Sequence, residues 1–338
     1  MSSILNKNNK LYLPSGHVDH TAHGRTESME SFGSTISTGI KKSAKYQHQI
    51  SSDSSLSTSS VAPAADVFPY GGTDVEELKQ KHGYKTVKVV HWIRHAQGYH
   101  NVNGGADAQK RSCIDARLTP HGIEQCQGLA AQIHNAPEGS RLAHVRDNAE
   151  LIITSPVTRC VQTALHSLEP VLEQNPGIPF IANEAIRETV NFNCDRRRPI
   201  HEIAADFPMV DFSVACPNDE DAIWEYYEKM LGDDTEYKLE REQAEIHVIA
   251  DRTRAFFEWL AEERDEQNII VCCHATVSRC IFNYGHPGKA ACDIAQLLDT
   301  RGPEAEDIPV IKYANRDAES MREDFKNCEL RSMVVAYK

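Results

Sequence analysis

The residues best suited to chemistry in this sequence are Arg94 and His95, which lie together in the stretch VKVVHWIRHAQGYHN (87–101). A guanidinium can hold two phosphate oxygens at once, and a neutral imidazole beside it can attack phosphorus. Placed at the end of a strand, such a pair indicates phosphoryl chemistry. The alternative for the pair taken alone is a structural histidine next to an arginine paired at the surface.

Three further residues could act with this pair. Arg159 falls in the first turn of a helix predicted in SPVTRCVQTA (155–164), where the helix dipole disfavours a cation unless an anion lies nearby. His274 follows the apolar run of residues 269–273, as His95 follows its own. Glu188 leaves a short strand within IRE (186–188), although a loop glutamate near cations is often only a solvated ion pair. Taken alone, Arg159 has an equally simple interpretation as a surface residue.

The pattern of apolar runs and caps shows which elements would position these residues. Strands are expected at 87–93, 180–182 and 269–273, with a second strand ending at Thr154 and a closing strand at 328–337. A helix is expected to begin with Thr119 as N-cap and Pro120 at its first position, and another after Ser155 as cap.

Because strands alternate with helices, the fold class predicted is a three-layer α/β/α sandwich with a mostly parallel central sheet. Arg94 with His95, Arg159 and His274 would then meet at one edge of the sheet, where open α/β folds bind their ligands. Further helices are expected at 73–82, 219–231 and 240–264, and residues 285–326 are interpreted as an insertion or a long loop.

Composition narrows the class of protein. The 338 residues are 40% hydrophobic and 25% charged, as in globular proteins, and the net charge of −13 argues against nucleic-acid binding. Apolar runs are too short to span a bilayer, and the ten cysteines form no CxxC pair. We therefore expect a cytoplasmic protein with a small anionic substrate and no membrane or nucleic-acid partner.

The first 70 residues are rich in serine, with SSDSSLSTSS at 51–60 the densest patch. Such a segment buries too little apolar surface to offset its ordering entropy, so residues 1–70 are predicted to be a disordered tail. The tail is either a plain flexible segment or an arm that is regulated by phosphorylation or used in targeting. Residues 71–338 would form the catalytic domain.

Four motifs together resemble the histidine phosphatase superfamily, also called phosphoglycerate mutase-like, over roughly residues 85–338. Within the superfamily, the sequence looks most like phosphoglycerate mutase-like proteins of plants and fungi. This likeness rests on the motif RHAQGYHN and the segments CDRRRP (194–199) and NCELRSMVV (327–335). The matching motifs are IRHAQGYHN (93–101) for the Arg-His pair, SPVTRCVQTA for the second Arg, IRE for the acid and VCCHATVSR (271–279) for the second His.

Two residues depart from the family pattern. Ala96 and Ala275 stand where glycine usually follows each histidine. Both substitutes are small, so we expect the pocket to survive, but they weaken any claim to mutase activity proper. The long segment after residue 285 also departs from compact members.

The resemblance implies a role for each matching residue, and no metal or cofactor. His95 would be the nucleophile that carries the phosphoryl group, while Arg94, Arg159 and His274 would surround its oxygens. Asn101 would add a neutral donor, and Glu188 would protonate the leaving oxygen and later activate water.

The residues and the resemblance are compatible with three functions. The first is a phosphomonoesterase acting through phosphohistidine, and the second is a phosphomutase with the same intermediate. The third is a catalytically inactive module that binds phosphate. The run Arg196–Arg198 could supply the second anion site that a mutase needs, or could be an ordinary surface cluster.

Overall fold

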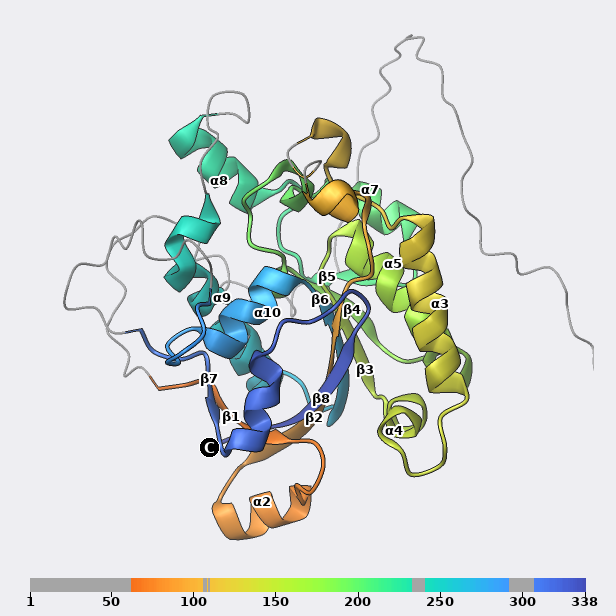
Figure 1. Cartoon of the computed structure of the whole chain (residues 1–338), viewed down its shortest axis with the longest axis vertical. Coiled ribbons are helices and arrows are strands. Elements are labelled where there is room, and N and C mark those ends of the chain that lie inside the picture. Colours follow the sequence, from red (N-terminus) through yellow and green to blue (C-terminus); the bar gives the residue numbers. More distant parts are fainter. Residues whose placement is uncertain (1–61, 106–107, 109, 233–240, 292–306) are drawn as a thin grey trace, which may run out of the picture. The chain divides into compact units, whose positions relative to one another are not determined.

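The structure is a computed structural model, and it describes residues 62–105, 108, 110–232, 241–291 and 307–338. Most of the predicted tail lies outside these residues. The described part contains one eight-stranded sheet in the order β5-β4-β3-β6-β2-β8-β1-β7 (Figure 1). The strands are β1 (Ala65–Pro69), β2 (Thr86–Arg94), β3 (Leu151–Thr154), β4 (Phe180–Asn183), β5 (Asp211–Ala215), β6 (Asn268–Cys273), β7 (Ile311–Tyr313) and β8 (Leu330–Tyr337).

One strand of the described sheet, β8, runs in the direction opposite to all the others. Every pairing from β5 through β4, β3 and β6 to β2 is parallel, whereas β8 runs antiparallel to both of its neighbours, β2 and β1. The predicted mostly parallel sheet is therefore confirmed. Because β3, β6 and β2 are adjacent and parallel, their carboxyl ends open at one edge.

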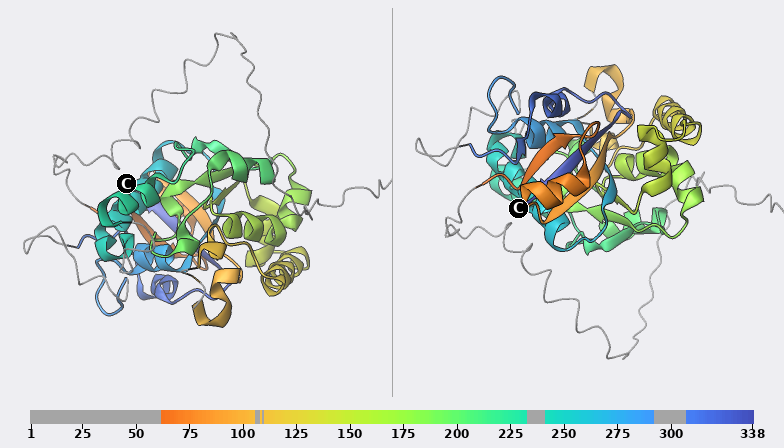
Figure 2. Two further views of the ribbon diagram at one scale, coloured as in Figure 1. Left: turned by 90° about the horizontal axis from the view of Figure 1, so that it is seen from above. Right: turned by 90° about the horizontal axis from the view of Figure 1, so that it is seen from below.

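Helices cover both faces of the sheet. Figure 1 shows α9 and α10 on one side of the sheet and α3, α4 and α5 on the other, and the two views of Figure 2 agree. The helices are α2 (Val75–His82), α3 (Pro120–His134), α4 (Arg141–Asn148), α5 (Thr158–Ser167), α6 (Glu169–Gln174), α7 (Ile200–Asp206), α8 (Ala222–Leu231), α9 (Ile246–Glu262) and α10 (Ala275–Asn283). Short 3-10 helices are η1 (Tyr99–Gly105), η2 (Arg111–Cys113), η3 (Glu184–Ile186), η4 (Asn193–Asp195), η5 (Glu242–Glu245) and η6 (Arg316–Arg322).

The central strands carry apolar residues on both faces, as a sheet covered on both sides requires. In β2, Trp92 packs in the cluster that includes α9 and α10, while the next residue, Ile93, packs in the cluster that includes α3 and α5. Ile270 and Val271 divide in the same way in β6. The three-layer α/β/α architecture predicted from the sequence is confirmed.

Local signals place several helices correctly. The predicted cap of α3 is confirmed, since Thr119 accepts from the backbone N–H of Gly122. At α2 the N-cap is Asp74, which accepts from the backbone N–H of Glu77. Gly122 has a further reason to be glycine, since a Cβ there would lie 2.1 Å from the carbonyl oxygen of Gln97. Helix α3 can therefore press directly against the turn that follows the nucleophile candidate.

The predicted start of the helix after β3 is wrong. Helix α5 begins at Thr158 rather than after Ser155, and its N-cap Val157 has no side-chain hydrogen bond. The acceptor comes from elsewhere in the chain, because the carboxylate of Asp115 accepts from the backbone N–H of Thr158 at 2.7 Å. Ser155 is thereby free to contact another side chain.

The predicted tail extends too far toward the carboxyl end. Residues 65–69 form β1, which lies between β8 and β7, and Val67 within it is fully buried. Ala65 and Val67 alternate inward, which is a strand signal that the neighbouring serine-rich composition hides. The segment 285–326 also holds structure, since it contains β7 and η6, and Met321 joins the core; residues 292–306 within it are not described.

Within the described ranges, the search for a helix long and apolar enough to cross a bilayer finds none.

Candidate active site

Two histidines meet at the carboxyl edge of the sheet. His95 follows β2 and His274 follows β6, and these strands pair in register up to Arg94 and Cys273. The two imidazole centroids lie 5.1 Å apart, and both side chains are almost fully buried. The parallel register therefore brings together two residues that are distant in the chain.

Hydrogen bonding fixes the tautomer of His95. Its Nδ1 lies 2.7 Å from the carbonyl oxygen of Ala96, and a carbonyl can only accept, so Nδ1 carries the proton. Burial and the nearby Arg159 hold the pKa of His95 well below its usual range. The ring is therefore neutral near pH 7, with its lone pair on Nε2.

The backbone around His95 is held from three sides. Its N–H donates to the carbonyl of Cys273 at 2.8 Å, and its carbonyl accepts from Asn327 Nδ2 at 3.0 Å. The next N–H, that of Ala96, donates to Thr163 Oγ1 at 3.0 Å. Such preorganisation is what a nucleophile needs.

Two arginines lie close enough to His95 to affect its charge state. Arg159, the second residue of α5, is fully buried, and its Nη1 donates to the carbonyl of Cys194 at 2.6 Å. Arg94 donates through Nη1 to the carbonyl of Phe325 at 2.6 Å, and burial lowers its pKa while Glu188 opposes that effect. Among the described residues, no partner is found for the Nε of either guanidinium. Both therefore keep a donor available to an added anion.

His274 has contacts that the sequence did not predict. Its Nε2 shares a hydrogen bond with Ser155 Oγ at 2.8 Å and lies 3.3 Å from Cys160 Sγ. Burial and Arg159 hold its pKa well below the usual range, so it too is neutral. Ser155, which the sequence suggested as a helix cap, orients this second histidine instead.

His100 is a site residue that sequence reasoning missed. Its ring centroid lies 5.3 Å from that of His95, and burial lowers its pKa to about 2. Its Nδ1 has no hydrogen-bond partner in the described part of the chain. The sequence signal that could have identified His100 is its position five residues after the Arg-His pair, in the same turn.

Glu188 lies beside this cluster and against α10. Its Oε1 accepts from the backbone N–H groups of Val277 and Thr189, both at 3.0 Å, and its Oε2 accepts from that of Thr276 at 3.3 Å. The side chain is 9% exposed and interacts electrostatically with Arg94 and Arg159. The carboxylate is thus fixed next to both arginines while keeping contact with solvent.

Asn101 takes part in the turn after His95. Its Oδ1 accepts from the backbone N–H of Gly98 at 3.1 Å, so its amide N–H₂ is the group that could reach a ligand. Its expected role as a substrate donor stays a prediction.

The run Arg196–Arg198 is occupied by internal partners. Arg197 is 3% exposed and donates to Glu184, so it is not a surface residue. Arg198 pairs with Asp115 and Asp206, and the guanidinium of Arg196 lies over the ring of Trp224. These contacts leave little reason to assign the run to a second substrate anion.

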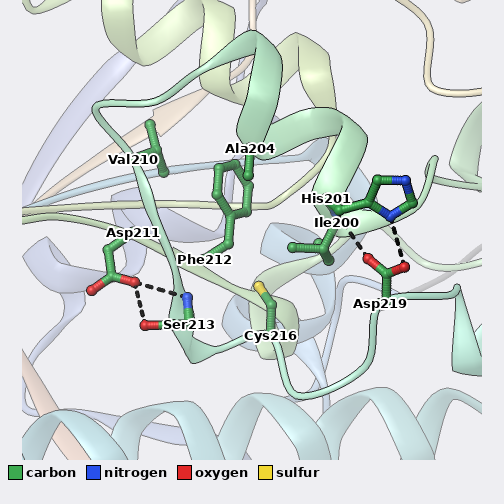
Figure 3. A pocket seen from close by; sticks show the side chains of 9 residues that line it. All are labelled: Ile200, His201, Ala204, Val210, Asp211, Phe212, Ser213, Cys216 and Asp219. Atoms are coloured by element: carbon green, nitrogen blue, oxygen red, sulfur yellow. Dashed lines mark hydrogen bonds and ion pairs between the residues drawn. The ribbon is translucent and has the colours of Figure 1, made fainter. Parts of the chain in front are cut away.

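A hollow of about 430 Å³ lies away from this cluster, beside the edge strand β5. Figure 3 shows its apolar wall, with the ion pair of His201 and Asp219 at one side and Asp211 bonded to Ser213 at the other. It contains none of the residues singled out by the sequence. In the described part of the chain, no group of three or more His, Cys, Asp or Glu side chains is arranged to hold a metal ion.

Comparisons with known proteins agree with the motifs. Residues 90–211 match the family model described as histidine phosphatase superfamily (branch 1). A phosphoglycerate mutase-like protein of Arabidopsis thaliana is 28% identical over 275 residues, which is 73% of this chain and 84% of the relative. A Saccharomyces cerevisiae protein named probable phosphoglycerate mutase is 25% identical over 224 residues, which is 59% of this chain and 73% of the relative. These sequence matches confirm the resemblance to this superfamily.

Similarity to solved structures is weaker. The alpha-ribazole phosphatase from Shigella flexneri is 19% identical, covering 72% of this chain and 89% of its own, with a TM-score of 0.37. The fold assignment therefore depends on the observed sheet order and helix layers.

Proposed function

We propose that this chain, a relative of the histidine phosphatase superfamily, hydrolyses a small phosphomonoester through a phosphohistidine on His95. One observation carries the proposal most directly. The buried, neutral imidazole of His95, with its lone pair on Nε2, lies among Arg94, Arg159 and His274. Among the described residues, the Nε of each of the two guanidiniums has no hydrogen-bond partner. We call these four residues the phosphate cage.

In the first step, His95 Nε2 forms a bond to phosphorus as the ester oxygen departs. The Arg94 and Arg159 guanidiniums and the His274 ring stabilise the charge that spreads over the three equatorial oxygens. Glu188 gives its proton to the leaving oxygen, so that an alcohol rather than an alkoxide is released.

In the second step, water attacks the phosphohistidine. The Glu188 carboxylate, now without its proton, takes one proton from the water as its oxygen bonds to phosphorus. Inorganic phosphate forms, His95 returns to the neutral imidazole, and Glu188 is again protonated. The atoms and charges balance with no other reactant.

We propose hydrolysis rather than a mutase reaction, in which the phosphoryl group would return to a second position of the substrate. A mutase must bind a second anionic group, and the run that could do so, Arg196–Arg198, has all three of its members paired with carboxylates. We assign the activity to residues 62 onward, because β1 belongs to the sheet.

The test is turnover of an aryl phosphate without bisphosphate priming. We expect steady phosphate release by the wild type and none above background for His95→Ala, with acid-labile, base-stable phosphate trapped on the wild type. His201→Ala is the matched control, since His201 is exposed and its ring pairs with Asp219, away from the phosphate cage. Equal turnover by wild type and His95→Ala would refute the proposal, and binding without turnover by the wild type would favour the inactive module.

A further inference from the structure

Asp195 lies behind the phosphate cage and contacts Arg159. Its Oδ2 accepts from the backbone N–H groups of Phe192 at 2.8 Å and Asn191 at 3.2 Å, which fixes the carboxylate. Its Oδ1 lies 3.4 Å from Arg159 Nη2. The Asp195 side chain is 5% exposed and that of Arg159 is fully buried, so the pair is shielded from water.

The length of this contact is informative. Charge-assisted N–H···O bonds are usually about 2.7–2.9 Å, so the pair at 3.4 Å is loose. By comparison, Arg187 meets Asp221 at 2.6 and 2.7 Å through two parallel bonds. Arg159 is thus attracted by Asp195 without being saturated by it.

The charged and titratable groups that face Asp195 come from three segments. Burial raises the pKa of Asp195, Arg159 on α5 lowers it, and the Glu188 carboxylate raises it, with the result that it lies at about 6. Cys194 donates through its thiol to Oδ1, and Arg187 donates to the backbone carbonyl of Asp195. The Arg159 guanidinium therefore faces Asp195 on one side and the other members of the phosphate cage on the other side.

We propose that Asp195 is a positioning residue that acts as a displaceable counter-ion for Arg159. It holds the guanidinium in place while the cage is empty, and its negative charge weakens the hold of Arg159 on a bound anion. Because this rests on the proposed function, the bound anion is the phosphoryl group and the benefit is release of the phosphate product.

Loss of the Asp195 charge should change anion affinity in an unusual direction. Replacing Asp195 by asparagine removes a charge that competes with the ligand, so anion affinity should rise, by about tenfold for one charge at this distance. A purely structural pair predicts the opposite, because a misplaced Arg159 would bind the anion more weakly. The turnover number of Asp195→Asn should fall while KM also falls, as expected when product release becomes slower.

Affinity is measured by titration calorimetry of the full chain with inorganic sulfate, which keeps one charge state through the range tested. We expect tighter binding by Asp195→Asn and tighter binding by the wild type as pH falls through about 6. The control is Glu184→Gln, whose carboxylate pairs with Arg187 at 2.6 Å, and it should leave binding unchanged. The wild-type titration needs no variant to fold.

Weaker or unchanged sulfate binding by folded Asp195→Asn, or a flat wild-type pH profile, would overturn this proposal. Neither result would affect the proposed hydrolysis. Failure of the wild type to bind sulfate or phosphate in competition with substrate would instead refute the proposed function itself.

Discussion

Arg159 and Arg187 are both fully buried, yet their charges are met in different ways. Arg187 contacts two carboxylates at 2.6 Å, those of Asp221 and Glu184. Arg159 has one carbonyl at 2.6 Å and one carboxylate at 3.4 Å. Both residues have an Nε without a partner among the described residues, so the difference lies in the carboxylates. Two close carboxylates balance the charge of Arg187, which supports the fold, whereas the weaker pairing of Arg159 indicates a place for a ligand. We call Arg187, Glu184 and Asp221 the Arg187 cluster.

The largest expected difference between the two regions concerns their glutamates. Glu188→Gln cannot give or take a proton, so turnover of an alkyl phosphate, whose leaving oxygen needs protonation, should fall by about 10²–10⁴. Glu184→Gln, in the Arg187 cluster, should keep turnover within about threefold. Steady-state kinetics and phosphate binding check both, and binding should survive in each variant.

A normal rate for Glu188→Gln on an alkyl phosphate would remove it as the acid. Asp195, the other carboxyl close to Arg159, would then be the candidate acid rather than a counter-ion.

Replacing each of the two arginines should affect a different property, which is activity for Arg159 and stability for Arg187. Arg159→Ala should lower kcat/KM by about 10²–10³, as other losses of a transition-state donor do. Arg187→Ala leaves Asp221 buried without its main cation and should cost about 3–5 kcal/mol of unfolding free energy. Urea unfolding and kinetics measured per folded molecule distinguish the two, and a rate for Arg159→Ala within threefold of wild type would place it outside the cage.

The smallest expected effect is in the pH dependence of stability. Arg187 outweighs burial and lowers the pKa of Asp221 below 3.8, so its contribution is present above that pH and is lost as pH falls further. The contribution of Asp195 to stability changes with pH in the opposite direction. Its pKa is raised from 3.8 to about 6, so its contribution is present below 3.8 and is lost as pH rises through about 6.

Unfolding free energy measured against pH therefore has a distinct feature for each carboxyl. Asp195→Asn should flatten the change between about pH 4 and 6, on the order of 2–3 kcal/mol in the wild type. Asp221→Asn should flatten the decline below about pH 4. An unchanged profile in either variant would contradict the assignment for that residue.

Much of the fold could be predicted because its signals are local. Apolar runs before His95 and His274 identified two central strands, and Thr119 with Pro120 marked the start of α3. Such signals depend on neighbours in the chain, so one sequence is enough to interpret them.

The remaining features depend on contacts between distant residues. Asp115 caps α5 across 43 residues, and Ser155 bonds to His274 across 119. Nothing near Arg187 in the motif IRE distinguishes a paired arginine from a catalytic one, because its partner Asp221 lies 34 residues away. Strand β5 was not predicted, since only two of its five residues are buried.

Strand β8 has a consequence for the order of events during synthesis. It consists of Leu330–Tyr337 and follows every other strand of the described sheet in the chain, yet it lies between β2 and β1, which are made much earlier. While the ribosome is still translating, β2 has no partner on that side, and its apolar edge is open to other chains. Synthesis of Leu330–Tyr337 therefore completes the pairing of β2, and a stop codon before Leu330 would leave that edge of β2 open.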